Sequence, residues 1–215
     1  MNELEDLRVM VRGLLDQRAS SDQVRSAAHS RVGHDVELWS TMAELDLLGL
    51  LVPEEHGGAG AGLAEIAVLL NELGRRAVPL PVISSAVLAP TALLAGSNGA
   101  LAADLLPSLT TGQRRAAVVI GGAEGQLSPR AWSLTWVPDG EGVTLTGKAG
   151  FVLDAGGADI LIVPARSDSG LVIAAVDPSQ ASVIETPTTD FTRRLGRVAF
   201  DDVIVPPERI VATAD

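Results

Sequence analysis

The sequence has 215 residues, enough for one large domain or two small ones, with 47% hydrophobic residues and a net charge of −11. An acidic chain without a basic run is a poor candidate for binding nucleic acid or an anionic membrane. The absence of cysteine excludes disulfides, thiolate metal sites and a cysteine nucleophile. The N-terminus does not resemble a signal peptide, and no apolar run is long enough for a membrane span, so we expect a soluble, cytoplasmic protein.

The first third of the chain has helical periodicity. Apolar residues between positions 4 and 15, with acidic residues early and Arg18 late, predict a helix of about 17 residues. Ser20 to Asp22 form a break that includes an N-cap. The polar segment from Gln23 to His34 predicts a loop or a short helix with little core contact.

The stretch from Trp39 to Pro81 predicts two helices joined by a glycine-rich turn. Gly49 is expected to end the first helix in the left-handed conformation. Four glycines between positions 57 and 62 predict a tight turn. A phosphate-binding loop is less favoured there, because no strand precedes it and no Walker lysine follows. The second helix is expected to end at Arg75 and Arg76 and to bury one apolar face, formed by Leu63, Ile66, Ala67, Leu70, Leu73 and Gly74.

The next segment continues the helical pattern. Ser84 to Ala95 predicts one bent helix or two short ones, because Pro90 interrupts it. Ala100 to Leu106 predicts another helix.

From about residue 114 the hydrophobic period changes from 3.6 to 2, which predicts β-strands. Two alternating segments flank the turn Pro138-Asp139-Gly140-Glu141-Gly142 and predict a β-hairpin. The fold class is therefore α+β: an N-terminal helical bundle over residues 1–113, followed by a small antiparallel β-sandwich or barrel over residues 114–215.

Three stretches resemble the acyl-CoA dehydrogenase family. They are A-E-L-D-L-L-G-L-L-V-P-E-E-H-G-G-A-G, T-G-K-A-G-F-V-L-D-A-G-G-A-D and R-V-A-F-D-D-V-I-V-P-P-E-R-I-V. The second is similar to the family pattern Lys-x-(Trp/Phe)-(Ile/Val)-Thr-Asn, and the third to the signature that closes the family's middle β-domain. The resemblance covers nearly the whole chain. It implies that the C-terminal four-helix domain of the family is absent here.

The resemblance also implies the chemistry. Family members bind FAD and remove hydrogens from Cα and Cβ of an acyl-CoA, with a glutamate as base. That glutamate is expected beyond Asp215, so no catalytic residue is assigned. The family-equivalent flavin-binding positions are Ile120, Gly121, Gln126, Leu127, Phe151 and Leu153.

Three of those positions lack the hydroxyl group that the family pattern carries. Gly121 and Leu127 replace a threonine and a serine that bond the isoalloxazine edge, and Leu153 replaces a threonine near flavin N5. Phe151 keeps the aromatic position. Unpaired flavin heteroatoms would cost about 1–3 kcal/mol each.

This pattern is similar to the degenerate subunit of heteromeric bacterial steroid and branched acyl-CoA dehydrogenases. The expected function is therefore a subunit of an FAD-dependent acyl-CoA dehydrogenase that works with a paralogous partner, which binds the FAD or shares it. The expected partners are an acyl-CoA substrate and a paralogous subunit or further copies of the chain. Two alternatives remain: a non-catalytic structural partner, and a flavin monooxygenase-like member of the superfamily.

Other polar residues give weaker signals. No Asp or Glu lies in an apolar strand context that would favour a tuned general base, and no cluster at ligand spacing indicates a metal site. His56 in the glycine-rich turn is interpreted as structural. Arg193, Arg194 and Arg197 form a basic cluster, which predicts a solvated or subunit-facing patch more strongly than a site for a CoA phosphate.

Overall fold

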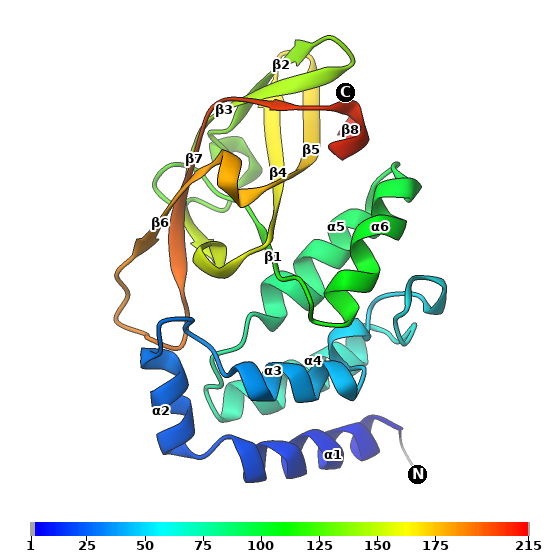
Figure 1. Ribbon diagram of the computed structural model, residues 1–215, viewed down its shortest axis with the longest axis vertical. Coiled ribbons are helices and arrows are strands. Elements are labelled where there is room, and N and C mark those ends of the chain that lie inside the picture. The colour runs from blue at the N-terminus through cyan, green and yellow to red at the C-terminus, as the bar shows by residue number, and fades with distance from the viewer. Residues whose placement is uncertain (1–2, 215) are drawn as a thin grey trace.

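A computed structural model describes residues 3–214 of the chain. Six α-helices come first, and eight strands follow (Figure 1). The helices are α1 (Glu3–Arg18), α2 (Ser21–His29), α3 (Val36–Glu44), α4 (Leu63–Arg75), α5 (Ala89–Ala95) and α6 (Gly99–Thr110). The strands are β1 (Ala116–Val118), β2 (Thr135–Asp139), β3 (Gly142–Leu153), β4 (Ile160–Ser167), β5 (Gly170–Val176), β6 (Ser182–Thr186), β7 (Leu195–Val205) and β8 (Ile210–Ala214). The predicted α+β class and the order of its parts are confirmed.

The strands form one sheet in the order β6-β7-β3-β2-β4-β5-β8, with β1 paired to β4. Most neighbours are antiparallel, as predicted, but β1 and β2 each pair with β4 in parallel, so the sheet is mixed. The predicted hairpin is β2–β3, where Asp139 pairs with Gly142 around Gly140, whose φ is +61°. Because α6 ends at Thr110 and β1 begins at Ala116, we propose a domain boundary at residues 113/114 within that connection.

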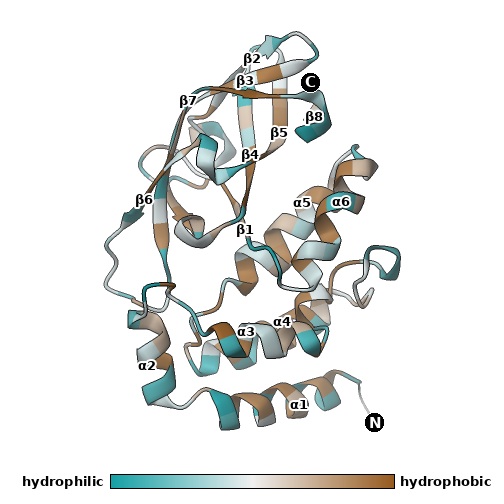
Figure 2. Cartoon of the chain, viewed as in Figure 1, coloured by the Kyte–Doolittle hydropathy of each residue, from teal (hydrophilic) through white to brown (hydrophobic). Residues whose placement is uncertain are grey.

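Three apolar clusters hold the structure together. One lies among α1, α3 and α4, and a second lies within the sheet. The third joins the two parts, and Figure 2 shows hydrophobic colour along its helices α5 and α6. Its members include Leu93, Leu105, Ile160, Ile162 and Val211. Burial of apolar surface therefore fixes α5 and α6 against β1, β4 and β5.

Ser84 and Ser85 add polar contacts at this junction. Both lie in a π-helical segment, Ile83–Leu88, that runs directly into α5. Pro90 lacks an N–H for the α-helical ladder, and the wider π turn just before it accommodates that loss. Ser85 Oγ donates to the Ala116 carbonyl and accepts from the Ala116 N–H, at 3.1 and 3.0 Å. The bent helix predicted around Pro90 is thus one continuous helix that includes a π-helical segment.

Helix ends and faces differ from the prediction in three places. Helix α3 ends at Glu44, and Asp46, not Gly49, takes the left-handed conformation with φ +56°. Helix α6 continues through Pro107 to Thr110. The buried residues of α4 are Ile66, Val68, Leu69, Glu72 and Leu73, whereas Leu63, Ala67 and Gly74 are exposed. The prediction of a single apolar face was wrong, because α1 covers α4 on one side and other residues of the bundle cover it on another.

The segment predicted as a loop or short helix is helix α2. Ser20 and Gln23 form a capping box at its start, because the Ser20 Oγ accepts from the Gln23 N–H and the Gln23 side chain accepts from the Ser20 N–H. Ala27 and Ala28 are buried, so the helix has more core contact than its polar sequence indicates.

A buried carboxylate connects α1 to α4. Only 2% of the Glu72 side chain is exposed, and Arg12 binds it through two nitrogens at 2.8 and 3.1 Å. Arg8 and Arg75 lie 3.6 Å from it. The Arg12 hydrogen bonds lower the pKa of Glu72 despite the opposing effect of burial.

We expect Glu72→Gln to lower the free energy of unfolding by about 2 kcal/mol at neutral pH, less than for a fully buried pair because the arginines reach water. A lowered folded-state pKa stabilises the protein only while the carboxylate is charged. The difference should therefore shrink as the pH falls below the ordinary value of 4.5. Urea denaturation at neutral and acidic pH measures this. Glu44→Gln, at the exposed end of α3, is the control, and an equal Glu72→Gln effect at both pH values would contradict the ion-pair explanation.

Candidate functional site

Most of the predicted flavin-facing positions lie in the connection between β1 and β2 and on the adjacent part of β3. Gly121 has a φ of +139°, which favours glycine. The next residue, Gly122, donates its N–H to the Gln126 carbonyl at 2.9 Å and accepts from the Gly150 N–H at 3.0 Å. These bonds hold the loop against β3. Ile120 is half-buried at the base of the loop.

Phe151 projects from an irregular part of β3. Its φ is +55°, and the β3–β7 register shifts between Ala149 and Val152. Its ring lies over Gly125, where an added Cβ would come within 2.3 Å of a ring carbon. The side chain is 46% exposed. The loop and Phe151 therefore fit each other closely, and glycine is required at position 125.

An outer hollow of about 470 Å³ lies beside Phe151 on the face of β3, β7 and β6. Its lining residues are Ala123, Glu124, Lys148, Ala149, Phe151, Ser182, Ile184, Arg197, Val198 and Ala199. Ile184 is 63% exposed, so the hollow combines apolar surface with two cationic side chains. A planar aromatic ligand with a polar edge would suit such a surface.

Leu127 and Leu153 do not complete this hollow. Leu127 is 69% exposed on the loop. Leu153 instead lines a separate cavity of about 50 Å³ with apolar residues of α4 and the 78–83 segment. The structure thus brings Gly121, Gln126 and Phe151 together and places Leu153 elsewhere.

These residues do not fit a complete flavin site within this chain. No hydroxyl side chain is present at positions 121, 127 or 153 to bond flavin heteroatoms. Trp132, in the same β1–β2 connection, has a buried Nε1–H without a partner among residues 3–214. Trp136 donates to the Gly170 carbonyl at 3.1 Å and packs on the sheet core.

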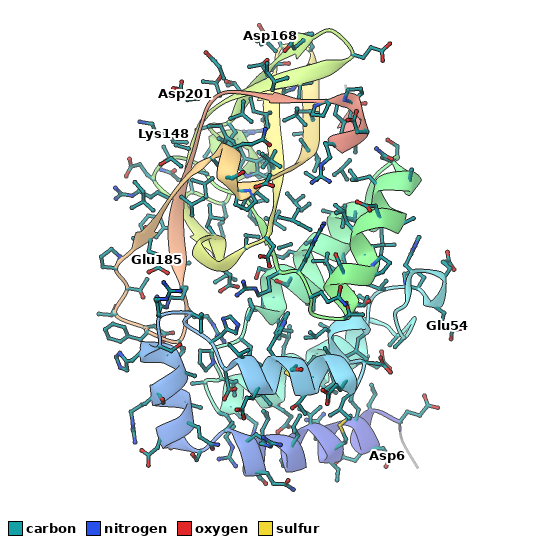
Figure 3. The ribbon with its side chains drawn as sticks, viewed as in Figure 1. Asp6, Glu54, Lys148, Asp168, Glu185 and Asp201 are labelled. Atoms are coloured by element: carbon teal, nitrogen blue, oxygen red, sulfur yellow. The ribbon has the colours of Figure 1, made fainter. Side chains whose placement is uncertain are left out.

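A second concave site, the junction cleft, lies between the helices and the sheet and has a volume of about 320 Å³. Its lining residues are Arg31, Val32, Gly33, His34, Pro79, Leu80, Pro81, Arg115, Asp154, Gly156, Gly157, Glu185, Thr192 and Arg194. In Figure 3, Glu185 marks the end of the sheet near this cleft, and Lys148 of the outer hollow lies farther from the helices. The two sites are therefore on different parts of the sheet.

Asp154 is the buried acid of the junction cleft. It follows the last residue of β3 with a φ of +58°, and its Oδ2 lies 2.5 Å from the Ser84 Oγ. Burial raises its pKa from the ordinary 3.8 to about 6, although the Ser84 bond, Arg193 and Arg115 act in the opposite direction. The sequence-based statement that no acid has a tuned environment is therefore wrong. Residues of the helical part, about 70 positions earlier, create that environment.

The Ser84 hydroxyl lies between the Asp154 carboxyl and a backbone carbonyl. The Ser84 hydroxyl has one proton but lies near two acceptors, the Pro81 carbonyl at 3.1 Å and the Asp154 carboxyl. If Asp154 is protonated, it donates to Ser84, and Ser84 donates to Pro81. If Asp154 is ionised, one acceptor loses its donor. Burial, and not the Ser84 bond, is what raises the pKa of Asp154.

The arginine cluster near the C-terminus is divided among three places. Arg194 contacts Glu185 and donates to the Ala28 and Ser30 carbonyls at the end of α2. Arg193 donates to the Val78 carbonyl, and Arg197 lines the outer hollow. Arg193 and Arg194 therefore bind backbone carbonyls in the N-terminal part of the same chain, so the three arginines do not form the single patch that was predicted.

The described residues contain neither a cluster of metal-ligating side chains nor a helix suited to cross a membrane. No group of three or more metal-ligating side chains gathers anywhere within 3–214. In the same range, no helix combines the length and the apolar composition that a membrane crossing needs.

An all-α part followed by a mixed sheet occurs in many solved structures. The ChsE4-ChsE5 complex from Mycobacterium tuberculosis matches the whole chain with a TM-score of 0.90 and 26% identity. A variant of the Tcur3481-Tcur3483 steroid ACAD matches 98% of the chain with a TM-score of 0.86 and 32% identity. The chain covers 58% and 57% of those two chains. These structural relatives are heteromeric complexes.

The model of the acyl-CoA dehydrogenase N-terminal domain matches residues 1–113. The chain therefore belongs to the acyl-CoA dehydrogenase family, whose members are FAD-dependent oxidoreductases acting on CH–CH groups. It is 44% identical over 93 residues to acyl-CoA dehydrogenase IpdE2 of Mycolicibacterium smegmatis, covering 43% of this chain and 30% of that protein. It is 30% identical over 180 residues to acyl-CoA dehydrogenase FadE27 of Mycobacterium tuberculosis, covering 82% of this chain and 47% of that protein. The chain thus spans half or less of the length of these relatives.

Proposed function

We propose that this chain is a subunit of a heteromeric, FAD-dependent acyl-CoA dehydrogenase whose flavin is held mainly by a paralogous partner. The observation that carries this proposal is that Phe151 lines the outer hollow, whereas the family-equivalent positions Gly121, Leu127 and Leu153 carry no hydroxyl group. The similarity to two heteromeric steroid complexes supports it. From that similarity we infer that the substrate class is a steroid-derived or branched acyl-CoA.

In this proposal the chain supplies a surface and not the catalytic base. Phe151 would pack against the flavin ring, and the loop with Ile120, Gly121, Gln126 and Leu127 would lie along its edge. Bound FAD would supply the hydride acceptor. The partner would provide the hydrogen-bond donors missing here, because buried flavin heteroatoms need them.

The test is to purify this chain with a paralogous acyl-CoA dehydrogenase subunit and measure flavin absorbance near 450 nm. We expect one flavin per pair of chains. Phe151→Leu should shift the flavin absorbance and lower the dehydrogenation rate, whereas Ile204→Ala, an exposed change on β7 outside the hollow, should leave both unchanged.

The other outcomes separate the alternatives. Two flavins per pair, or stoichiometric flavin on this chain alone, would overturn the proposal. An unchanged spectrum and rate for Phe151→Leu would indicate a purely structural subunit. Hydroxylation with oxygen and reduced flavin would indicate the monooxygenase-like alternative.

A further inference from the structure

The junction cleft contains two guanidinium groups with unused hydrogen-bonding capacity. Arg31 is exposed and forms no ion pair within residues 3–214. The Arg115 side chain contacts Asp159 through Nε alone, at 3.4 Å, so its two Nη groups bond no residue in that range. Arg194, by contrast, already uses both Nη groups for Glu185, Ala28 and Ser30. Arg31 and Arg115 are therefore the donors available to a ligand.

His34 adds a hydrogen-bond acceptor to the same cleft. The residue is only 9% exposed, and its Nδ1 lies 3.1 Å from the Val32 carbonyl. Because a carbonyl can only accept, Nδ1 carries the proton. Burial lowers the pKa of His34, and nearby Arg115 acts in the same direction, so the ring is neutral near pH 7. The remaining nitrogen, Nε2, is then an acceptor.

We propose that the junction cleft binds a small oxyanion of the phosphate class, held by Arg31 and Arg115 with its protonated oxygen donating to His34. Guanidinium groups match the geometry of phosphate oxygens. A carboxylate has no proton to donate to a neutral imidazole, whereas a partly protonated phosphate has both acceptors and a donor. A cleft of about 320 Å³ has room for a phosphomonoester as well as for inorganic phosphate. This inference does not depend on the flavin proposal.

Asp154 makes the binding depend on pH. Two charged groups lie near its carboxyl: Arg193, just before β7, and Arg115, just before β1. The uncharged Ser84 faces it from the π segment. Glu185, Arg194 and His34 line the same cleft. Ionised Asp154 opposes an anionic ligand, and protonated Asp154 does not. Binding should therefore weaken as the pH rises through the pKa of Asp154, about 6.

The test is isothermal titration of the 215-residue chain with inorganic phosphate and with glycerol 3-phosphate, at constant ionic strength in chloride. We expect saturable binding that weakens by about tenfold in Arg31→Gln and in Arg115→Gln, equivalent to about 1.4 kcal/mol. Arg130→Gln is the matched control, because Arg130 is exposed in the 129–131 turn outside the cleft. Arg31 lies in an exposed loop, so its variant tests the site even if Arg115→Gln does not fold.

Asp154→Asn separates the effect of the protein on pH dependence from the titration of phosphate itself. The variant should bind more tightly than the native chain at pH 8 and equally at pH 5.5. Saturable binding of glycerol 3-phosphate alone, or of both probes, supports the proposal. The ratio of the two affinities shows whether the cleft prefers a phosphate ester or inorganic phosphate. The absence of saturable binding, an equal loss in Arg130→Gln, or malonate binding as tightly as phosphate would overturn it.

Discussion

Asp154→Asn is expected to raise the free energy of unfolding by about 3 kcal/mol at pH 7.5 and to leave it nearly unchanged at pH 4. The pKa of this carboxyl rises from 3.8 to about 6 in the folded protein. A raised pKa means that the folded state holds the proton more tightly than the unfolded state. The native chain therefore loses stability as the pH rises from about 4 to about 6 and no further above that range.

An asparagine at position 154 reproduces the hydrogen bonds of the protonated acid. Its amide can donate to the Ser84 Oγ, so Ser84 can donate to the Pro81 carbonyl. Urea denaturation at both pH values measures the effect. Asp168→Asn in the exposed β4–β5 turn is the control and should change stability at neither pH. A variant that is less stable than the native chain at pH 7.5 would show that the charged carboxylate stabilises the junction.

Gly58→Ala is expected to lower the free energy of unfolding by about 3 kcal/mol. An added Cβ would lie 2.0 Å from the Val52 carbonyl oxygen and 2.5 Å from its carbon. That oxygen accepts the Gly60 N–H at 2.9 Å, and Val52 is completely buried. The backbone cannot move away without breaking the turn between α3 and α4.

Gly74→Ala is the matched control for that change. Gly74 lies in α4, and nothing is within 4 Å of an added Cβ. Alanine is the better helix former, so this variant should be more stable by about 0.5 kcal/mol. Thermal and urea unfolding of both variants measures the contrast. Similar stability in the two variants would mean that the 57–62 turn rearranges freely, contrary to the close contact described here.

The local sequence determined the parts of the fold that depend on nearby residues. The helical period, the capping residues around Ser20 and the Pro138–Gly142 turn all act over a few positions, so α1, the start of α2 and the β2–β3 hairpin follow from them. The glycines at 57 and 60 likewise have positive φ values, +79° and +61°, as a tight turn requires. The family resemblance rested on the order and spacing of such local motifs.

Only the tertiary structure decided the features that join distant segments. The burial of Asp154 depends on Ser84 and on the helical residues around it, and the junction cleft needs the α2–α3 connection beside the sheet. The position of Leu153 was decided in the same way, because an apolar side chain at a strand end packs against whichever apolar surface the fold brings near it. Periodicity shows that a residue tends to be buried, but the pKa of an acid depends on the solvent and charges around it in space. Those surroundings exist only after the helices have packed on the sheet.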